Sequence, residues 1–441
     1  MKCCNVKINI KKEPVKLDIK TNIAVTGKQS YSTIVDLSMP DGDQVIIPNE
    51  GKVFSKVTVK KPDTMVPENI RKGTDIGGVV GTMTPAQPDM LQQLVDLTGK
   101  LTGLSGNPTV TNYDFLENLD TSKVTSFASM FSGDNLLERV PESWNTSNVT
   151  DFGNCFNFFR NMAFSKIPNW DYSKGENVKR FLSSSYNVTD VTMNIPNVSK
   201  AEWMFYDSYG FKNVKLTTSS KLTSLLGMFS NCDDLGENIT VSNTENVTDV
   251  SQMFEYTSGI ETIPNFNFKN VTNASNFVRY STKIKKVPNI FGNKVTSFGY
   301  FAYDCRTLED CELDMLSCTN SGLIFSNCRS LTNLKLHNIK INTAIGSGAS
   351  YGTKLTKESL IFCIKELWSY KDTTTTRTLT ISTPSKTLIA DIYVKLITPT
   401  QEQIEADPYI NDKLPCEVCE SIDEGAMTIT AYANLKNWTI A

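Results

Sequence analysis

The segment Val247-Thr248-Asp249-Val250-Ser251-Gln252-Met253-Phe254 contains the motif on which the fold depends. Related copies recur through the middle of the chain, and in all but a degraded copy at 177–181 an apolar residue is followed seven residues later by Phe or another apolar residue. One such unit cannot bury an apolar face alone, whereas stacked units form one continuous core. Successive copies are 20 to 29 residues apart, and the nine copies begin at residues 124, 149, 178, 198, 222, 247, 271, 295 and 318.

A second apolar column follows roughly nine residues after the Phe column. Its members are Val140, Ile167, Val214, Ile239, Ile263, Val287, Cys311 and Leu334. The stretch Leu331-Thr332-Asn333-Leu334-Lys335-Leu336 has the strand pattern of the leucine-rich class, whose period is 20–29 residues. We therefore expect a strand near this column and a turn or short helix on the opposite side. The repeat core is predicted to contain Phe131, Phe156, Phe205, Phe229, Phe254 and Phe325.

The copies resemble a named subfamily, the BspA-like leucine-rich repeats. The resemblance is carried by Asp120-Thr121-Ser122-Lys123-Val124, by Asn145-Thr146-Ser147-Asn148-Val149-Thr150 and by Met228-Phe229-Ser230-Asn231-Cys232-Asp233-Asp234-Leu235. It covers roughly residues 115–340 and recurs in phase with the repeat. The resemblance implies a role in adhesion, because such repeats occur in bacterial surface proteins and in virion proteins of bacteriophages.

Residues 1–84 are predicted to form a β module. Val6–Ile10 and Val15–Ile19 alternate apolar and polar residues with a period of two, which is typical of strands. The stretches 49–59 and 67–82 resemble segments of phage tail and adhesion proteins, with Asp75 where an apolar residue is usual. The N-terminus lacks the apolar run of a secretory signal, so we expect no export by the usual route.

The predicted fold class is mainly β with short helices. A leucine-rich-repeat-like solenoid of about nine units over 116–340 follows the β module and a helix and linker at 85–115. An α+β cap over 341–441 closes it, with a helix at Lys357–Tyr370 and a strand at Arg377–Ile381. The last residues resemble the ending of phage solenoids, with Asn437 replacing the usual Gly.

The charge and the apolar content of the sequence argue against a nucleic-acid-binding protein and against a membrane-spanning one. The 44 basic and 47 acidic residues give a net charge of −3, and the absence of a basic run argues against nucleic-acid binding. No stretch reaches the ~20 apolar residues that a membrane span needs. The eleven Cys residues are scattered over a long chain, so we expect buried, reduced thiols.

No catalytic, metal or cofactor site is predicted. His337 is the only His, which leaves a catalytic triad or dyad with one candidate base. Cys416-Glu417-Val418-Cys419 lacks both a second ligand pair for zinc and a thioredoxin-like context. Carboxylate pairs occur by chance along any long solenoid, so their number does not indicate a glycosidase. We therefore expect a protein that is not an enzyme.

Several aromatic residues lie off the apolar columns, and exposed rings commonly anchor partners and sugars. The candidate exposed aromatics are Trp144, Trp170, Tyr172, Tyr206 and Tyr209, with Trp203 nearby. The structural alternative is that these rings cover the edges of irregular repeats.

The expected function is host attachment or structural decoration in the tail or baseplate of a phage virion, after synthesis in the host cytoplasm. The expected partners are other virion proteins, through the N-terminal module, and a host surface glycan or protein. A homo-oligomer or multiple copies are also expected, because avidity would strengthen weak contacts. The alternatives are an exported bacterial adhesin and a glycan-cleaving tail protein.

Overall fold

The computed structural model describes residues 117–133, 138–158, 165–345, 352–370, 373–419, 421–422 and 424–441, together with six strands before residue 81. The chain divides into two compact units, Met1–Leu91 and Gln92–Ala441. The strand predicted at Val15–Ile19 and the helix predicted within 85–115 lie outside the described residues. The domain boundaries drawn at 84, 115 and 340 stay predictions.

The strands of the first unit form three pairs. Strands β1 and β3 pair antiparallel, β2 and β4 pair parallel, and β5 and β6 pair antiparallel. Their bounds are Val6–Ile8 for β1, Ser30–Val35 for β2, Gln44–Ile46 for β3, Val53–Val59 for β4, Asp75–Ile76 for β5 and Val79–Val80 for β6.

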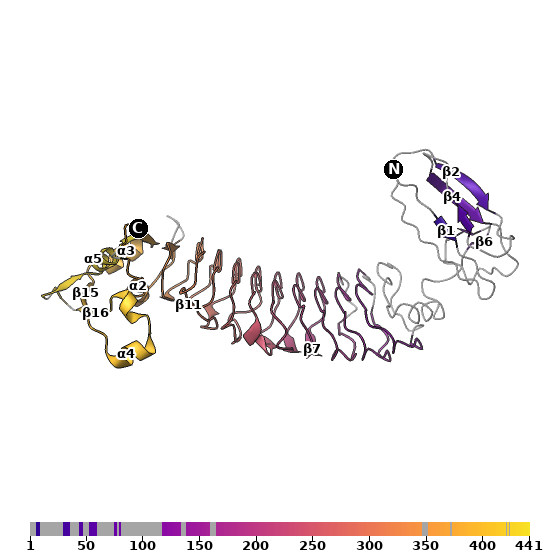
Figure 1. Cartoon of the computed structure of the whole chain (residues 1–441), viewed down its shortest axis with the longest axis horizontal. Coiled ribbons are helices and arrows are strands. Elements are labelled where there is room, and N and C mark those ends of the chain that lie inside the picture. Colours follow the sequence, from indigo (N-terminus) through magenta and orange to yellow (C-terminus); the bar gives the residue numbers. More distant parts are fainter. Residues whose placement is uncertain are drawn as a thin grey trace. The chain divides into compact units, whose positions relative to one another are not determined.

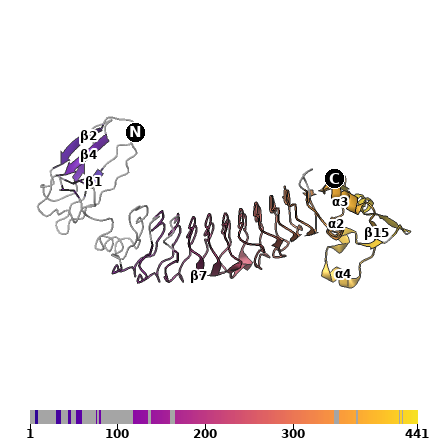
Figure 2. The same ribbon diagram turned by 180° about the vertical axis from the view of Figure 1, so that it is seen from behind.

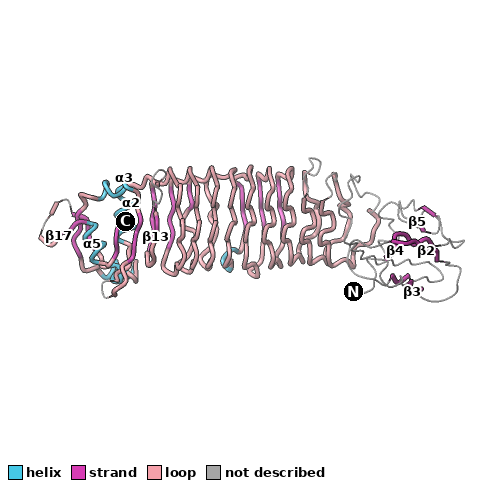
Figure 3. The backbone as a smooth tube through the Cα atoms, turned by 90° about the horizontal axis from the view of Figure 1, so that it is seen from above, coloured by secondary structure: helices cyan, strands magenta, loops and turns pink. Residues whose placement is uncertain are grey.

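The middle of the second unit is a β-solenoid of several turns, visible as successive rungs in Figure 1. Parallel strands stack in register along one face, where they lie side by side in Figure 3. These strands are β7 (Asp190–Asn194), β8 (Asn213–Thr217), β9 (Asn238–Val241), β10 (Lys286–Val287), β11 (Asp310–Asp314) and β12 (Asn333–His337). A short 3-10 helix, η3 (Thr244–Asn246), follows β9. The count of nine units stays a prediction.

The second apolar column lies on the inner side of these strands. Val214 pairs with Ile239, and Cys311 pairs with Leu334, in agreement with the expected strand positions. The weak copy at 177–181 had no second-column member in the sequence pattern. The structure provides Val191, which lies on β7 opposite Val214 and is 1% exposed.

The opposite side of each rung is built from tandem turns whose backbone amides alternate between two kinds of acceptor. The amides of Gln252 and Phe254 donate to Ser275 and Phe277 of the next rung at 3.0 and 2.9 Å. The amide of Met253 instead donates back to Val250 at 3.1 Å. Backbone donors are thus satisfied although no strand or helix forms there.

Each residue of the repeated motif has its own role in joining rungs. Asn246 donates from Nδ2 to the carbonyl oxygen of Ser220 at 2.9 Å, and Val247 is fully buried. The hydroxyl of Thr248 donates to a carbonyl of the preceding rung at 3.2 Å. Asp249 accepts the amide of Ser251 at 2.9 Å, which is the turn role expected for this Asp. Equivalent contacts recur in other rungs, for example from Asn270 Nδ2 to the carbonyl oxygen of Glu245 and from the Thr272 hydroxyl to that of Thr248, so the motif joins neighbouring rungs.

The Phe column lies inside the solenoid. The rings of Phe205, Phe229 and Phe254 stack with centroids 5.4 and 5.5 Å apart and interplanar angles of 13° and 15°. All the predicted core phenylalanines are at most 1% exposed, namely Phe131, Phe156, Phe205, Phe229, Phe254 and Phe325. Rings of neighbouring rungs bury one another, as the short repeat requires.

Buried thiols also join the rungs. Cys232 and Cys305 donate from Sγ to carbonyl oxygens of the preceding rung, those of Phe205 at 3.1 Å and Val278 at 2.7 Å. Burial raises the pKa of the Cys305 thiol to about 12, so the thiol stays protonated and remains a donor at neutral pH. Ser281 and Thr257 donate equivalent bonds from hydroxyl groups. The thiols are therefore reduced hydrogen-bond donors as well as small core residues.

The C-terminal region combines short helices with two small sheets. Strands β13, β14 and β18 form one parallel sheet, and β16, β15 and β17 form an antiparallel one. The strands are β13 (Thr343–Ala344), β14 (Arg377–Thr380), β15 (Tyr393–Leu396), β16 (Cys416–Cys419), β17 (Ala426–Thr428) and β18 (Trp438–Ile440). The helices are α2 (Lys357–Lys365), α3 (Thr383–Ile389), α4 (Gln401–Ala406), η4 (Ile410–Lys413) and α5 (Ile429–Leu435).

Helix α2 begins where the sequence predicts and ends earlier. Thr356 caps its N-terminus by accepting the Ser359 amide, but the helix stops at Lys365 rather than continuing to Tyr370. Two contacts end it: Leu367 joins a parallel bridge to Ile339, and Lys436 Nζ donates to the Leu367 carbonyl oxygen at 2.9 Å. Both hold the chain after Glu366 away from helical geometry.

Asn437, which stands where the resembling sequences have Gly, has a structural role. Asn437 follows α5 with a φ of 65°, a left-handed conformation that Asn tolerates better than most residues. Its side-chain amide donates to the carbonyl oxygens of Thr373 and Thr375 at 3.0 and 3.1 Å. The Asn side chain thus adds contacts that Gly could not make.

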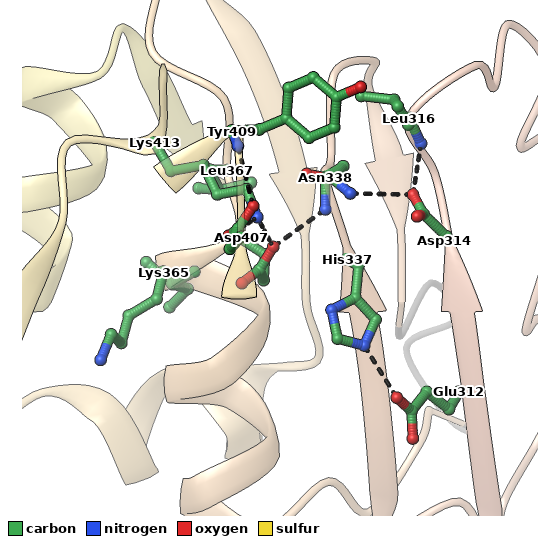
Figure 4. A network of polar contacts seen from close by, with 12 residues as sticks. Glu312, Asp314, Leu316, His337, Asn338, Lys365, Leu367, Asp407, Tyr409 and Lys413 are labelled. Atoms are coloured by element: carbon green, nitrogen blue, oxygen red, sulfur yellow. Dashed lines mark hydrogen bonds and ion pairs between the residues drawn. The ribbon is translucent and has the colours of Figure 1, made fainter. Parts of the chain in front are cut away.

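Polar contacts join the last rungs to the C-terminal region, which lies beyond them in Figure 2. Asn338 donates from Nδ2 to Asp314 and from its backbone amide to Glu366, both at 3.0 Å (Figure 4). Lys413 is 4% exposed and pairs with Glu366 at 2.5 Å and Asp407 at 2.7 Å. That this region acts as a cap stays a prediction.

The substitution Phe229→Ala should destabilise the solenoid strongly. It removes a ring stacked between two others, and a loss of about 3–5 kcal/mol of unfolding free energy is expected from the cavity. Urea denaturation followed by far-ultraviolet circular dichroism measures this loss. Lys215→Ala, on the exposed side of β8, is the matched control and should change stability by less than about 0.5 kcal/mol. Similar effects of the two substitutions would contradict the stacked core.

The substitution Lys413→Met should loosen the C-terminal region. It leaves the carboxylates of Glu366 and Asp407 without their shared cation, and breaking a buried pair costs about 3 kcal/mol. Hydrogen exchange should show faster amide exchange in α2 and η4, with little change at β8. The exposed Lys395→Met is the control. Unchanged protection at α2 would show that the pair does not hold the junction.

Candidate functional site: the aromatic turn face

The tandem turns place two residues of each rung in the left-handed backbone region. The first left-handed column contains Ser129, Asn154, Arg180, Trp203, Gly227, Gln252, Asn276, Tyr300 and Leu323. The second left-handed column contains Gly133, Phe158, Ser184, Asp207, Asn231, Tyr256, Tyr280, Asp304 and Asn327. Their φ values lie between 53° and 80°. We call the surface that these columns form the turn face.

Several residues in the two columns are poorly suited to a left-handed backbone. Gly, Asn and Asp suit a left-handed backbone, whereas other residues lose roughly 1–2 kcal/mol there. Trp203, Tyr256, Tyr280 and Tyr300 nevertheless occupy such positions. Tyr256 and Tyr300 are 46% and 42% exposed, so burial does not offset that loss. Strain of this kind at exposed side chains motivates a hypothesis of function.

Six large rings on or beside these columns form an aromatic strip. We define the strip as Trp203, Tyr206, Tyr256, Tyr280, Tyr300 and Tyr303. Tyr256 stacks on Tyr280 with centroids 4.7 Å apart, and Tyr280 meets Tyr303 edge-on at 5.4 Å. Tyr256, Tyr280 and Tyr303 thus come from three consecutive rungs, whereas Trp203 and Tyr206 lie two rungs before Tyr256. The rings hold one another in fixed positions, which reduces the entropy lost on binding.

Two arginines lie over rings of the strip. The guanidinium carbon of Arg180 is 5.7 Å from the ring centroid of Trp203, and that of Arg279 is 4.8 Å from Tyr280. Such cation–π contacts stabilise both partners modestly at exposed sites. Arg279 also pairs with the buried carboxylate of Glu255 at 3.1 Å. Cations and rings are therefore fixed together on this face.

A shallow groove of about 520 Å³ lies at one end of the strip. Trp203 and Tyr206 come from one rung, and Gln252, Glu255 and Tyr256 come from a later rung. The remaining lining residues are Arg180, Ser230 and Asn231. We call this the Trp203 groove. Its mixture of rings, amides and single charges can bind a ligand that has both apolar faces and hydroxyl groups.

The structure places the predicted aromatics in different environments. The prediction of exposure is wrong for Trp144, Trp170 and Tyr172, which are 4–5% exposed. Trp144 stacks on Trp170 at 5.8 Å, and Trp170 donates from Nε1 to the carbonyl oxygen of Pro141 at 2.8 Å. These rings fill the interior of the longer early units instead of marking a binding surface.

Two of the predicted aromatics remain partly exposed. Tyr206 belongs to the aromatic strip and lies edge-on to Trp203 at 5.1 Å. Tyr209 lies outside the groove and packs against Tyr186 at 4.6 Å, and burial raises the pKa of Tyr209. Whether either residue binds a ligand stays a prediction.

Most of the aromatic strip escaped the sequence analysis, which did not consider Tyr256, Tyr280, Tyr300 or Tyr303. A pattern in the repeat could have found three of them. The left-handed positions stand two residues before and two residues after each Phe-column position, as Gln252 and Tyr256 do around Phe254. Aromatic residues at these two offsets are therefore candidates for display on the turn face.

The other residues considered for catalysis or metal binding are His337, Cys416 and Cys419. His337 Nε2 donates to Glu312 Oε1 at 2.9 Å (Figure 4). The His337 ring also meets Phe362 edge-on. Cys416 and Cys419 lie on β16. Within the described parts of the chain, no three His, Cys, Asp or Glu side chains are placed to hold a metal ion. No helix there is both long and apolar enough to cross a membrane.

The substitution Tyr300→Asn tests the strain on the turn face. Asn suits the left-handed backbone, so the free energy of unfolding should stay equal or rise by about 1 kcal/mol. Thermal or urea denaturation measures the change. Tyr303→Asn is the control, because Tyr303 is not among the described residues with positive φ and gains no such relief. Equal destabilisation by both substitutions would remove the argument from strain.

Comparison with known proteins agrees with the repeat architecture. Residues 101–218 and 199–310 match the model of a family described as Mycoplasma protein of unknown function, DUF285. Neither the curated proteins nor the solved structures include a match. Together the matched segments span residues 101–310, which include most of the predicted solenoid at 116–340. Together, the family match and the β-solenoid fit a BspA-like repeat protein.

Proposed function

We propose that this chain is a bacteriophage virion protein of the tail or baseplate that attaches the particle to the host surface through its turn face. The observation that carries this proposal is the aromatic strip, whose exposed rings occupy strained backbone positions. A solenoid offers a long, stiff surface without a deep pocket, and this suits recognition of an extended surface ligand. The chain would act by binding and not by catalysis.

The phage assignment rests on the sequence resemblance of the N-terminal region. The stretch 49–59 contains β4, and the stretch 67–82 contains β5 and β6, which pair antiparallel. A module of this kind would contact other virion proteins. Several copies of the chain in one particle would convert weak single contacts into firm attachment by avidity.

Two measurements test this proposal. Mass spectrometry and immunogold labelling of purified particles should find the chain at the tail or baseplate. The purified protein, added in excess, should compete with particles for host cells and lower adsorption. A variant with Trp203, Tyr256, Tyr280 and Tyr300 each changed to Asn should fold and lose at least about ten-fold in competition, because exposed aromatic anchors dominate binding energy. Absence of the chain from particles would refute the virion assignment.

An exported bacterial adhesin is the second candidate. The matching family is described from Mycoplasma proteins, which favours a cellular origin. The turn face would then serve in contact between the bacterium and another surface. Immunofluorescence on intact, uninfected cells distinguishes the two functions, because only the adhesin should label their exterior.

A further inference from the structure

We propose that the Trp203 groove binds an uncharged glycan. This inference rests on the proposed attachment function and names the chemical class of the surface ligand. The groove is built from side chains that other contacts already hold in place, and its charges balance. Both features come from the described residues of four consecutive rungs.

Trp203 forms a fixed platform because the next rung leaves room for it. A Cβ atom on Gly227 would lie 2.1 Å from Cε3 of the Trp203 ring, so the indole rests directly on glycine backbone. Tyr206 contacts this ring edge-on, and Arg180 lies over it at 5.7 Å. The fixed indole lines the groove beside Arg180, where it can contact the C–H groups of a sugar with little loss of side-chain entropy.

The polar side chains of the groove are also held in place. Gln252 donates from Nε2 to Glu255 Oε2 at 2.6 Å, and Asn231 donates from Nδ2 to Asp207 Oδ1 at 2.5 Å. These bonds fix two planar amides, each of which carries both a donor and an acceptor. Vicinal hydroxyl groups of a sugar are themselves donors and acceptors, so they complement amides that point in fixed directions.

The charges of the groove favour an uncharged ligand. Arg180 and Glu255 are the charged lining residues, with one positive and one negative charge, and Glu255 is additionally paired with Arg279. An anionic polymer such as a teichoic acid or a polyuronate needs an excess of cations, which this lining lacks. The balance of charges therefore selects against polyanions.

The dimensions favour an extended chain of sugars over a single sugar. Gln252 and Tyr256 lie two rungs beyond Trp203, and successive rungs in a solenoid are about 4.8 Å apart. That spacing is close to the advance of one ring along an extended glycan. A chain lying along the solenoid axis could thus place one ring on Trp203 and later hydroxyl groups near Gln252.

A printed array of neutral and anionic bacterial oligosaccharides tests the inference with the full-length protein. Wild type should bind one or more neutral glycans, and Trp203→Ala should weaken that binding by about ten-fold or more, as loss of an aromatic anchor does. Gly227→Ala should weaken it similarly, because the added methyl group displaces the indole. Lys215→Ala is the control, since it lies on the exposed side of β8 and outside both the aromatic strip and the groove, and it should bind as wild type does.

Three array results would overturn the glycan assignment: binding to anionic glycans only, binding to no glycan, or equal binding by wild type and Trp203→Ala. Circular dichroism of each variant checks that the fold is kept. Wild-type binding to host cells is measured in parallel. Cell binding that protease treatment abolishes, together with an empty array, would refute the glycan while leaving attachment intact. Failure to bind untreated cells would instead refute the attachment function itself.

Discussion

The alternation of backbone hydrogen bonds in the turns is the constraint on which the structure depends. Amides such as those of Gln252, Phe254 and Tyr256 donate to the next rung, while the intervening ones fold back on their own rung. This pattern satisfies the backbone without regular strands, and it can continue only when neighbouring rungs have matching lengths and shapes. The stacked rings, the Asn and Thr contacts and the thiol donors all follow from that matching, because each repeats with the same spacing.

The same alternation also creates the surface proposed to recognise a ligand. Tandem turns place left-handed residues at two positions in each described rung, and most of the side chains there are partly or fully exposed. Rungs with Gly or Asn at these places contribute only backbone or small amides. Rungs with Trp203, Tyr256 or Tyr300 add rings at some cost in stability, as functional positions commonly do. Within each turn segment, the buried residues maintain the scaffold, whereas the left-handed residues beside them supply the candidate site.

The core of this protein could be predicted from its sequence, because stacking demands the same residue type in every unit. Val247 and Phe254 are recognisable for that reason, and the turn role of Asp249 follows from its recurrence. The burial of Trp144 and Trp170 agrees with the structural alternative, but their places in the interior could not be fixed, since an apolar pattern does not reveal how much space a longer unit encloses. The aromatic strip escaped because backbone handedness leaves no trace in hydrophobic periodicity. The early end of α2 depends on Leu367 and Lys436, whose partners are distant in sequence.

Gly227 illustrates how readily such a surface could change during evolution. The space above it exists because one rung has glycine where its neighbours have larger residues. Unequal recombination between similar repeats can add, remove or shuffle whole rungs without disturbing the register of those that remain. A single crossover could therefore move a glycine beneath a different ring, or separate Trp203 from Gln252 by one more rung. The specificity of the protein could then diversify in steps of whole repeats.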